Sequence, residues 1–207
     1  MNILSIPTGD YQEMCYIVWS QEKKALVFDP GFDADDLFQI LEKQELEVAA
    51  YVLTHTHYDH INALADLHEK APAPIMVHAK DWEWAFSERN QSIPHYPRPR
   101  KPEKATLQWL DDSKDWTVAD LTFQCVETPG HTPGGCCLLF PEGKIMITGD
   151  TLFKGSCGRT DLPGGNPRHL KDSLKLLREL DDDIQIFPGH GGDSTIGEEK
   201  ATNFFMQ

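Results

Sequence analysis

Four potential metal ligands stand within six residues, His55-Thr56-His57-Tyr58-Asp59-His60, directly after the apolar segment 49–53. If that segment is a strand, side chains two apart project to the same side, so His55 and His57 can bind one ion where the strand ends. Asp59 and His60 then fall where the chain turns into a helix and can face a second ion. The run therefore predicts a metal site with room for two ions.

Three further candidate ligands each follow an apolar, strand-like run and stand beside a glycine turn. The runs 121–126, 144–148 and 184–187 lead into Pro129-Gly130-His131, Gly149-Asp150 and Pro188-Gly189-His190. Glycine suits such turns because it tolerates positive φ and lets the backbone come close to a bound ion. Loops that leave strand ends at one edge of a sheet core can gather these distant ligands onto a rigid platform.

In their order along the chain, these motifs resemble the metallo-β-lactamase superfamily, and within it glyoxalase II, especially the short single-domain hydroxyacylglutathione hydrolases. Gly158-Arg159-Thr160-Asp161 and Thr195-Ile196-Gly197-Glu198-Glu199 support this. The resemblance implies one metal bound by His55, His57 and His131, and another bound by Asp59, His60 and His190. It also implies that Asp150 bridges the metals, that Asp59 orients the attacking water, and that Arg159 holds a carboxylate of glutathione.

Such a ligand set explains how hydrolysis proceeds without a serine or cysteine nucleophile. Two cations roughly 3.5 to 4 Å apart can lower the pKa of a shared water and polarise the carbonyl that it attacks. Five neutral imidazoles and two carboxylates leave net positive charge at the pair, which stabilises an oxyanion. A nitrogen and oxygen site without thiolate accepts two divalent ions, with zinc expected first and iron or manganese as alternatives.

The fold class expected is α/β, in one domain spanning 1–207. Apolar runs indicate strands at 3–6, 15–19, 25–28 and 74–78, and periodic patterns indicate helices at 33–44 and 61–70. Asn166 and Pro167 form an N-cap and first-turn pair for a helix that turns Leu170, Leu174 and Leu177 to the core. The resemblance implies a four-layered αββα sandwich with the metals at one edge of its sheets.

Composition limits the partners. The 19 basic and 33 acidic residues give a net charge of −14, which would repel phosphate backbones and excludes nucleic acid as an expected partner. The first residues lack a basic segment followed by a long apolar stretch, so we expect a cytoplasmic protein without membrane insertion. Five cysteines without a Cys-x-x-Cys pair indicate buried free thiols. The sequence leaves the oligomeric state open.

The other histidines indicate structural roles. We expect surface or capping positions for His68 and His169, and a strand end for His78, with contact to a metal ligand as the alternative for His78. His95 belongs to the proline-rich basic stretch 93–102, where proline blocks regular structure. This stretch is expected to be an exposed connector, with a lid that attracts an anionic thioester as the alternative. Trp82, Trp84 and Phe86 indicate packing.

The function expected is metal-dependent hydrolysis of a small-molecule thioester, S-lactoylglutathione or a related S-acyl glutathione. A persulfide dioxygenase with one iron is the alternative, but members of that type usually lack the complete second site that His190 supplies here. A β-lactamase or lactonase would use the same metal-activated water to open ring substrates. A binding or regulatory protein with a decayed site is the remaining alternative, although all seven expected ligands are present.

Overall fold

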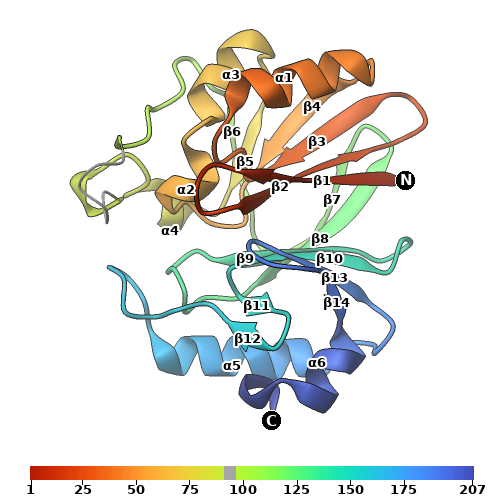
Figure 1. Ribbon diagram of the computed structural model, residues 1–207, viewed down its shortest axis with the longest axis vertical. Coiled ribbons are helices and arrows are strands. Elements are labelled where there is room, and N and C mark those ends of the chain that lie inside the picture. Colours follow the sequence, from red (N-terminus) through yellow and green to blue (C-terminus); the bar gives the residue numbers. More distant parts are fainter. Residues whose placement is uncertain (91–96) are drawn as a thin grey trace. The chain divides into compact units, whose positions relative to one another are not determined.

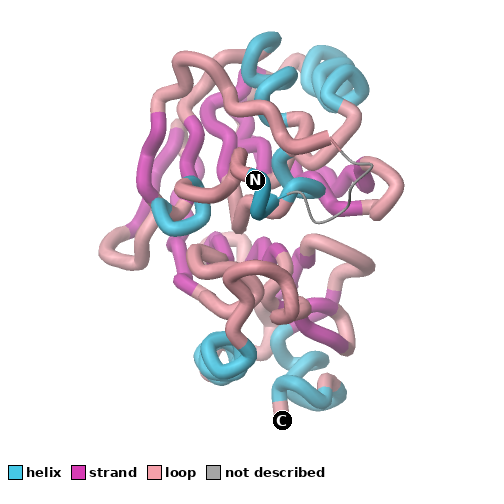
Figure 2. The backbone as a smooth tube through the Cα atoms, turned by 90° about the vertical axis from the view of Figure 1, so that its left-hand side faces the viewer, coloured by secondary structure: helices cyan, strands magenta, loops and turns pink. Residues whose placement is uncertain are grey.

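The computed structural model describes residues 1–90 and 97–207 and divides into two compact units. The first comprises Met1–Leu110 with Thr117–Leu121, and the second comprises Asp111–Trp116 with Thr122–Gln207. Each unit carries a mixed β-sheet with helices, as Figure 1 and, in a second view, Figure 2 show. The single domain expected over 1–207 stays a prediction.

The first sheet has the strand order β1-β2-β3-β4-β5-β6. Strands β1 to β3 pair antiparallel, and β3 to β6 pair parallel. The parallel part places the carboxyl ends of β3, β4 and β5 at one edge, where ligand sites commonly form. Its strands are β1 (Asn2–Thr8), β2 (Glu13–Trp19), β3 (Lys24–Phe28), β4 (Glu47–Val52), β5 (Ile75–Val77) and β6 (Leu107–Trp109).

Helices α1 and α3 lie together on one face of this sheet (Figure 1). Leu37 and Leu41 of α1 share a core with Tyr51 and Leu53. Residues four apart lie on the same face of a helix, and residues two apart lie on the same face of a strand, so each pair can face the other. The helices of this unit are α1 (Ala34–Lys43), α2 (Tyr58–Ile61), α3 (Leu64–Lys70), α4 (Ala79–Trp82) and the 3₁₀ turn η1 (Glu88–Asn90).

The second sheet has the order β14-β13-β10-β9-β8-β7. Strand β9 is antiparallel to both β8 and β10, and β10 is parallel to β13, so β8, β10 and β13 all end at the same edge. This edge therefore receives the loops that follow three strands. The strands are β7 (Asp115–Val118), β8 (Leu121–Glu127), β9 (Cys136–Phe140), β10 (Ile145–Gly149), β13 (Gln185–Pro188) and β14 (Ser194–Thr195).

Two helices and a small hairpin complete the second unit. Helix α5 (Pro167–Arg178) starts where the sequence predicts: Asn166 accepts from the N–H groups of Arg168 and His169, and Pro167 is the first helical residue. Its Leu170, Leu174 and Leu177 enter the second core, as expected. The other elements are the strands β11 (Leu152–Phe153) and β12 (Ser156–Cys157), helix α6 (Ile196–Thr202) and the 3₁₀ turn η2 (Phe204–Met206).

Three local expectations need correction or fall outside the description. The helix expected over 61–70 is interrupted, because the N–H of Ala63 bonds to the carbonyls of Pro30 and Gly31. His68 is buried rather than at the surface, with its ring 6.1 Å from that of Tyr51. Residues 93–96 of the stretch 93–102 lie outside the described residues, so the exposed connector and its alternative, a lid, both stay predictions. Among the described helices, none has the length and apolar character needed to span a membrane.

Candidate metal centre

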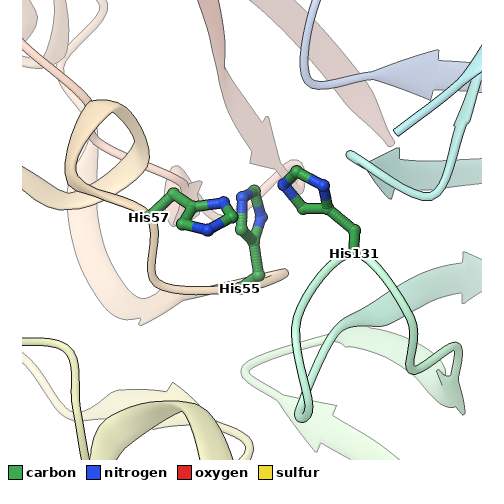
Figure 3. A group of neighbouring side chains, drawn as sticks. All are labelled: His55, His57 and His131. Atoms are coloured by element: carbon green, nitrogen blue, oxygen red, sulfur yellow. The ribbon is translucent and has the colours of Figure 1, made fainter. Parts of the chain in front are cut away.

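The first unit holds His55, His57 and His60 together at the carboxyl end of β4. His55 and His57 lie on the loop that leaves the strand, and His57 is the N-cap of α2. Figure 3 shows both rings rising from this loop, and also shows His131 on its own turn after β8. The ring centroids of His55 and His57 are 5.0 Å apart, and those of His55 and His60 are 4.0 Å apart. All three side chains are at least nine-tenths buried.

Asp59 stands beside this cluster in the first turn of α2 and is partly exposed. The backbone carbonyl of Asp59 packs against Gly31 so tightly that a Cβ on that glycine would come within 2.0 Å of it. Glycine is therefore required in the turn after β3, because any side chain there would push α2 away.

Asp29 organises the histidines of the first unit. Its Oδ1 accepts from the backbone N–H of Thr54 at 2.8 Å, and its Oδ2 accepts from the Thr54 hydroxyl at 2.5 Å. The same Oδ2 lies 3.0 Å from Nδ1 of His60. Asp29, His55 and His60 each offer a ligand atom within 4.8 Å of the others. One carboxylate thus connects the strand end to the helix that carries His60.

A second carboxyl group, that of Glu13, lies deeper behind His60. Its Oε1 is 3.5 Å from His60 Nδ1, and its Oε2 accepts from the Thr8 hydroxyl at 2.8 Å. Glu13 is fully buried, and this burial raises its pKa well above the usual value. Burying a carboxyl group costs free energy unless hydrogen bonds compensate, so its position beside His60 needs the Thr8 contact.

Hydrogen bonds also fix the backbone between His55 and His57. The Thr56 hydroxyl donates to the Asp81 carbonyl at 3.0 Å, and the Asn90 amide donates to the Thr56 carbonyl at 2.7 Å. The ring of Trp84 meets that of His57 edge-on, with centroids 5.5 Å apart. Trp82 and Trp84 are both buried, which confirms the packing role expected of them.

The second unit brings His131, Asp150 and His190 together at the edge where β8, β10 and β13 end. Oδ2 of Asp150 is 3.3 Å from His131 Nε2 and 3.8 Å from His190 Nε2. The N–H of Gly189 donates to the Gly149 carbonyl at 2.8 Å, which couples the two neighbouring strand ends. One oxygen of Asp150 therefore lies near the Nε2 atoms of two imidazoles.

Glycines allow the turns of this edge to close, as the sequence predicts. Gly130 and Gly149 have φ values of 142° and 47°. A Cβ on Gly130 would also come within 2.2 Å of the Leu170 nitrogen, at the start of α5. Gly158 is tighter still, since its Cβ would lie 1.8 Å from the Asp150 carbonyl oxygen and 3.0 Å from His131 Nδ1.

Hydrogen bonds assign the tautomers of three histidines, and this tests whether they fit a metal. The Thr54 hydroxyl donates its hydrogen bond to Asp29, so toward His55 Nδ1, at 3.1 Å, it can only act as an acceptor. His60 Nδ1 donates to the Asp29 carboxylate, and His131 Nδ1 donates to the Arg159 carbonyl at 2.7 Å. With Nδ1 as the donor, Nε2 carries the lone pair whenever the ring is neutral. Metal-binding histidines typically show this arrangement, so the donor set fits divalent cations.

Arg159 makes contacts through both its backbone and its side chain, and its binding of a carboxylate of glutathione stays a prediction. Its backbone carbonyl orients His131, while its guanidinium forms a two-pronged ion pair with Asp161, both contacts being 2.7 Å. The neighbouring Arg159 guanidinium lowers the pKa of Asp161 to about 2. A ligand carboxylate would therefore have to compete with Asp161 for this cation.

The sequence analysis missed Asp29, Thr54 and Glu13 as residues of this centre. Asp29 offers one signal, because it is an acidic residue directly after a buried strand and before Pro30-Gly31. Its φ of 45° is a conformation that non-glycine residues rarely adopt. Thr54 and Glu13 have no comparable local signature. His78 caps α4 by accepting from the N–H of Lys80.

Comparisons with known proteins show the family to which the chain belongs. The model of the metallo-β-lactamase superfamily matches residues 8–190. The hydroxyacylglutathione hydrolase GloC of Haemophilus influenzae is 34% identical over 208 residues, which cover all of this chain and 98% of that protein. The chain therefore belongs to the metallo-β-lactamase superfamily, a family of metal-dependent hydrolases.

Two solved structures give the same result for the fold. The BLEG-1 B3 metallo-β-lactamase has a TM-score of 0.91 and 34% identity, and the match covers 99% of both chains. The protein TTHA1623 in a di-iron-bound form has a TM-score of 0.85 and 34% identity, and the match covers 98% of this chain and 99% of that one. The α/β fold class of αββα type that the sequence predicts is confirmed.

Proposed function

We propose that this superfamily member hydrolyses a thioester, S-lactoylglutathione or a related S-acyl glutathione, at a site for two divalent metals. One observation carries the proposal: three histidines present Nε2 lone pairs because their Nδ1–H groups are held by the protein, and Asp150 lies beside two histidines. The full-length similarity to a hydroxyacylglutathione hydrolase supports the choice of substrate class.

In this proposal the two ligand groups act together. His55, His57 and His131 would hold one metal, Asp59, His60 and His190 would hold the other, and Asp150 would be the ligand shared by both. A set of nitrogen and oxygen donors favours zinc and also accepts iron or manganese. The di-iron form of TTHA1623, a relative with 34% identity, supports iron as the leading alternative to zinc.

When bound, the two cations supply Lewis acidity for the acyl carbonyl and lower the pKa of water. The residues of the chain then supply position. Asp59 orients the attacking water by accepting a hydrogen bond from it. Asp29 keeps His60 in one tautomer by direct contact, and keeps His55 in one tautomer through the hydroxyl of Thr54. The water oxygen bonds to the acyl carbon, and the C–S bond breaks with its electron pair on sulfur. One proton of the water goes to the sulfur and the other to solvent, so the products are a carboxylate and a thiol.

Arg159 is proposed to meet a carboxylate of the substrate. Its guanidinium is exposed and paired with Asp161, so binding exchanges one carboxylate partner for another. Exposed ion pairs are worth little, about 0 to 1 kcal/mol, so this exchange costs little but also selects weakly. We therefore expect the enzyme to tolerate changes in the thiol part of its substrate.

The test combines metal analysis of the purified protein with thiol release from S-lactoylglutathione. We expect two metals per chain and turnover, and in Asp150→Ala fewer metals and a loss of turnover by several orders of magnitude. Asp172→Ala, which removes an exposed carboxylate of α5 paired with Lys175, is the matched control and should keep both. An Asp150→Ala variant with full metal content and full rate would refute the bridging role.

Hydrolysis of a β-lactam ring is the second candidate, because a B3 metallo-β-lactamase shares 34% identity and nearly the whole fold. Rates on β-lactams and on S-lactoylglutathione, measured with the same metal-loaded sample, decide between the two. The one-iron dioxygenase alternative needs only part of the ligand set, and the position of His190 beside Asp150 argues against it. Oxygen uptake with glutathione persulfide would support that alternative.

A further inference from the structure

A pocket of about 610 Å³ lies within the second unit, outside the ligand groups described above. Its walls are the segment 157–160, the first two turns of α5, and the end of the chain. Figure 1 shows α5, α6 and the C-terminal end close to the β11–β12 hairpin. Pockets of 300 to 1,000 Å³ are of the size that binds small molecules.

The lining is mostly apolar. Leu170 and Leu174 of α5 form the buried floor, while Phe204 and Phe205 stand at the rim with 78% and 49% of their surface exposed. The two phenyl rings meet edge-on, with centroids 5.8 Å apart. Exposed aromatic side chains beside a hollow are typical of a surface that an apolar group covers.

The charged side chains of the lining are all basic. Arg159 and Lys171 both line the pocket, and none of its described lining residues is Asp or Glu. Arg159 is neutralised by Asp161, whereas Lys171 forms no ion pair within 1–90 and 97–207 and is exposed. In a chain of net charge −14, an exposed lysine beside an apolar floor favours an occupant with an apolar chain and one negative charge.

One wall of the pocket is shared with the candidate metal centre. The Arg159 carbonyl accepts from His131, and Gly158 packs against the Asp150 backbone. Substitutions in 157–160 would therefore disturb both sites. Phe204 and Lys171 stand on the other walls and can be changed without touching a proposed metal ligand.

We propose that this pocket binds a monocarboxylate with a medium-length alkyl chain, with the chain against Leu170, Leu174 and Phe204 and the carboxylate at Lys171. The proposal concerns binding alone and does not depend on thioester hydrolysis. The site needs no metal, so it remains testable in protein prepared without one.

The experiment measures equilibrium binding of decanoate to the full chain by calorimetry, with 1-decanol as the neutral analogue of the same length. We expect one saturable site per chain and a preference for decanoate over decanol of about fivefold, the upper range for an exposed charge pair. Decanoate should also slow alkylation of Cys157, which lines the pocket and is half-buried.

Two variants locate the binding. Phe204→Ala should weaken decanoate and decanol alike, whereas Lys171→Gln should remove only the preference for decanoate. Because both side chains are exposed, neither substitution should affect folding. Leu176→Ala and Lys175→Gln are the matched controls, since both residues are exposed on α5 but do not line the pocket.

Three results would overturn the proposal: no saturable binding of decanoate, binding that is unchanged in Phe204→Ala, or decanol bound as tightly as decanoate. None of these depends on whether the protein hydrolyses S-lactoylglutathione. A failure of the proposed function and a failure of this site are therefore separate results.

Discussion

Asp29 Oδ2 lies 3.0 Å from Nδ1 of His60, and the same carboxylate reaches His55 through the hydroxyl of Thr54. One buried acid thus sets the tautomer of two proposed metal ligands. Asp29 follows a parallel strand, β3, and Thr54 follows its neighbour β4. Because β3 and β4 are paired neighbours in the sheet, the ends of these strands place Asp29 next to Thr54 and the histidines.

Asp29→Asn should weaken metal binding. The carboxylate of Asp29 accepts from the Thr54 N–H, the Thr54 hydroxyl and His60. The amide of asparagine has only one oxygen that accepts, and its NH₂ group donates. At least one imidazole therefore loses its fixed tautomer. Loss of such a partner typically costs about 10- to 100-fold in metal affinity. Competition with a chromogenic chelator measures this affinity. Asp36→Asn, an exposed change on α1, is the control, and equal affinities in the two variants would contradict the role of Asp29.

Gly158→Ala should disturb the other ligand group. The new Cβ would lie 1.8 Å from the Asp150 carbonyl oxygen, so the segment that carries the Arg159 carbonyl must shift away from His131. We expect metal affinity to fall by about 10-fold or more, for the same reason. Gly192→Ala is the matched control, because no heavy atom lies within 4 Å of the added methyl. The same chelator competition compares them, and wild-type affinity in Gly158→Ala would show that the segment adapts.

Local patterns predicted most of the elements. The run expected at 144–148 is β10 at Ile145–Gly149, and the glycine turns next to His131 and Asp150 have the positive φ expected. Helix α5 starts at the predicted cap because side-chain capping and proline both act within one turn. Such features depend on neighbours in sequence, so a single sequence contains them.

The rest depends on contacts between distant residues. Asp29 contacts Thr54 and His60, which are 25 and 31 residues further along the chain, and no local pattern predicts such contacts. The break before α3 arises because Ala63 bonds to Pro30 and Gly31 instead of to its own helix. His68, on that short helix, is buried near Tyr51. Tertiary packing overrides the helical pattern at these positions.

Alkylation should distinguish Cys157 from the other cysteines. Cys15, Cys125, Cys136 and Cys137 are buried, and burial raises the pKa of Cys137 to about 12. The thiolate is the reactive form, so iodoacetamide at pH 8 should modify one thiol per native chain and five after denaturation. Partial burial also raises the pKa of Cys157, so its rate should still increase with pH above 8. Mass spectrometry counts the adducts, and several thiols reacting at one common rate would contradict the burial pattern.

Asn166→Ala should destabilise the second unit by about 1 kcal/mol, the typical cost of losing an N-cap. Asn166 Oδ1 accepts from the N–H groups of Arg168 and His169 at 3.0 and 3.2 Å, and alanine leaves both without that acceptor. Its backbone N–H donates to the Gly130 carbonyl at 2.7 Å, which the substitution keeps, so the turn before His131 should stay in place. Urea denaturation of protein prepared without metal measures the loss, and Asn166→Asp, which restores an acceptor at the helix start, should recover most of it. A stability of Asn166→Asp no higher than that of Asn166→Ala would show that the cap does not stabilise α5.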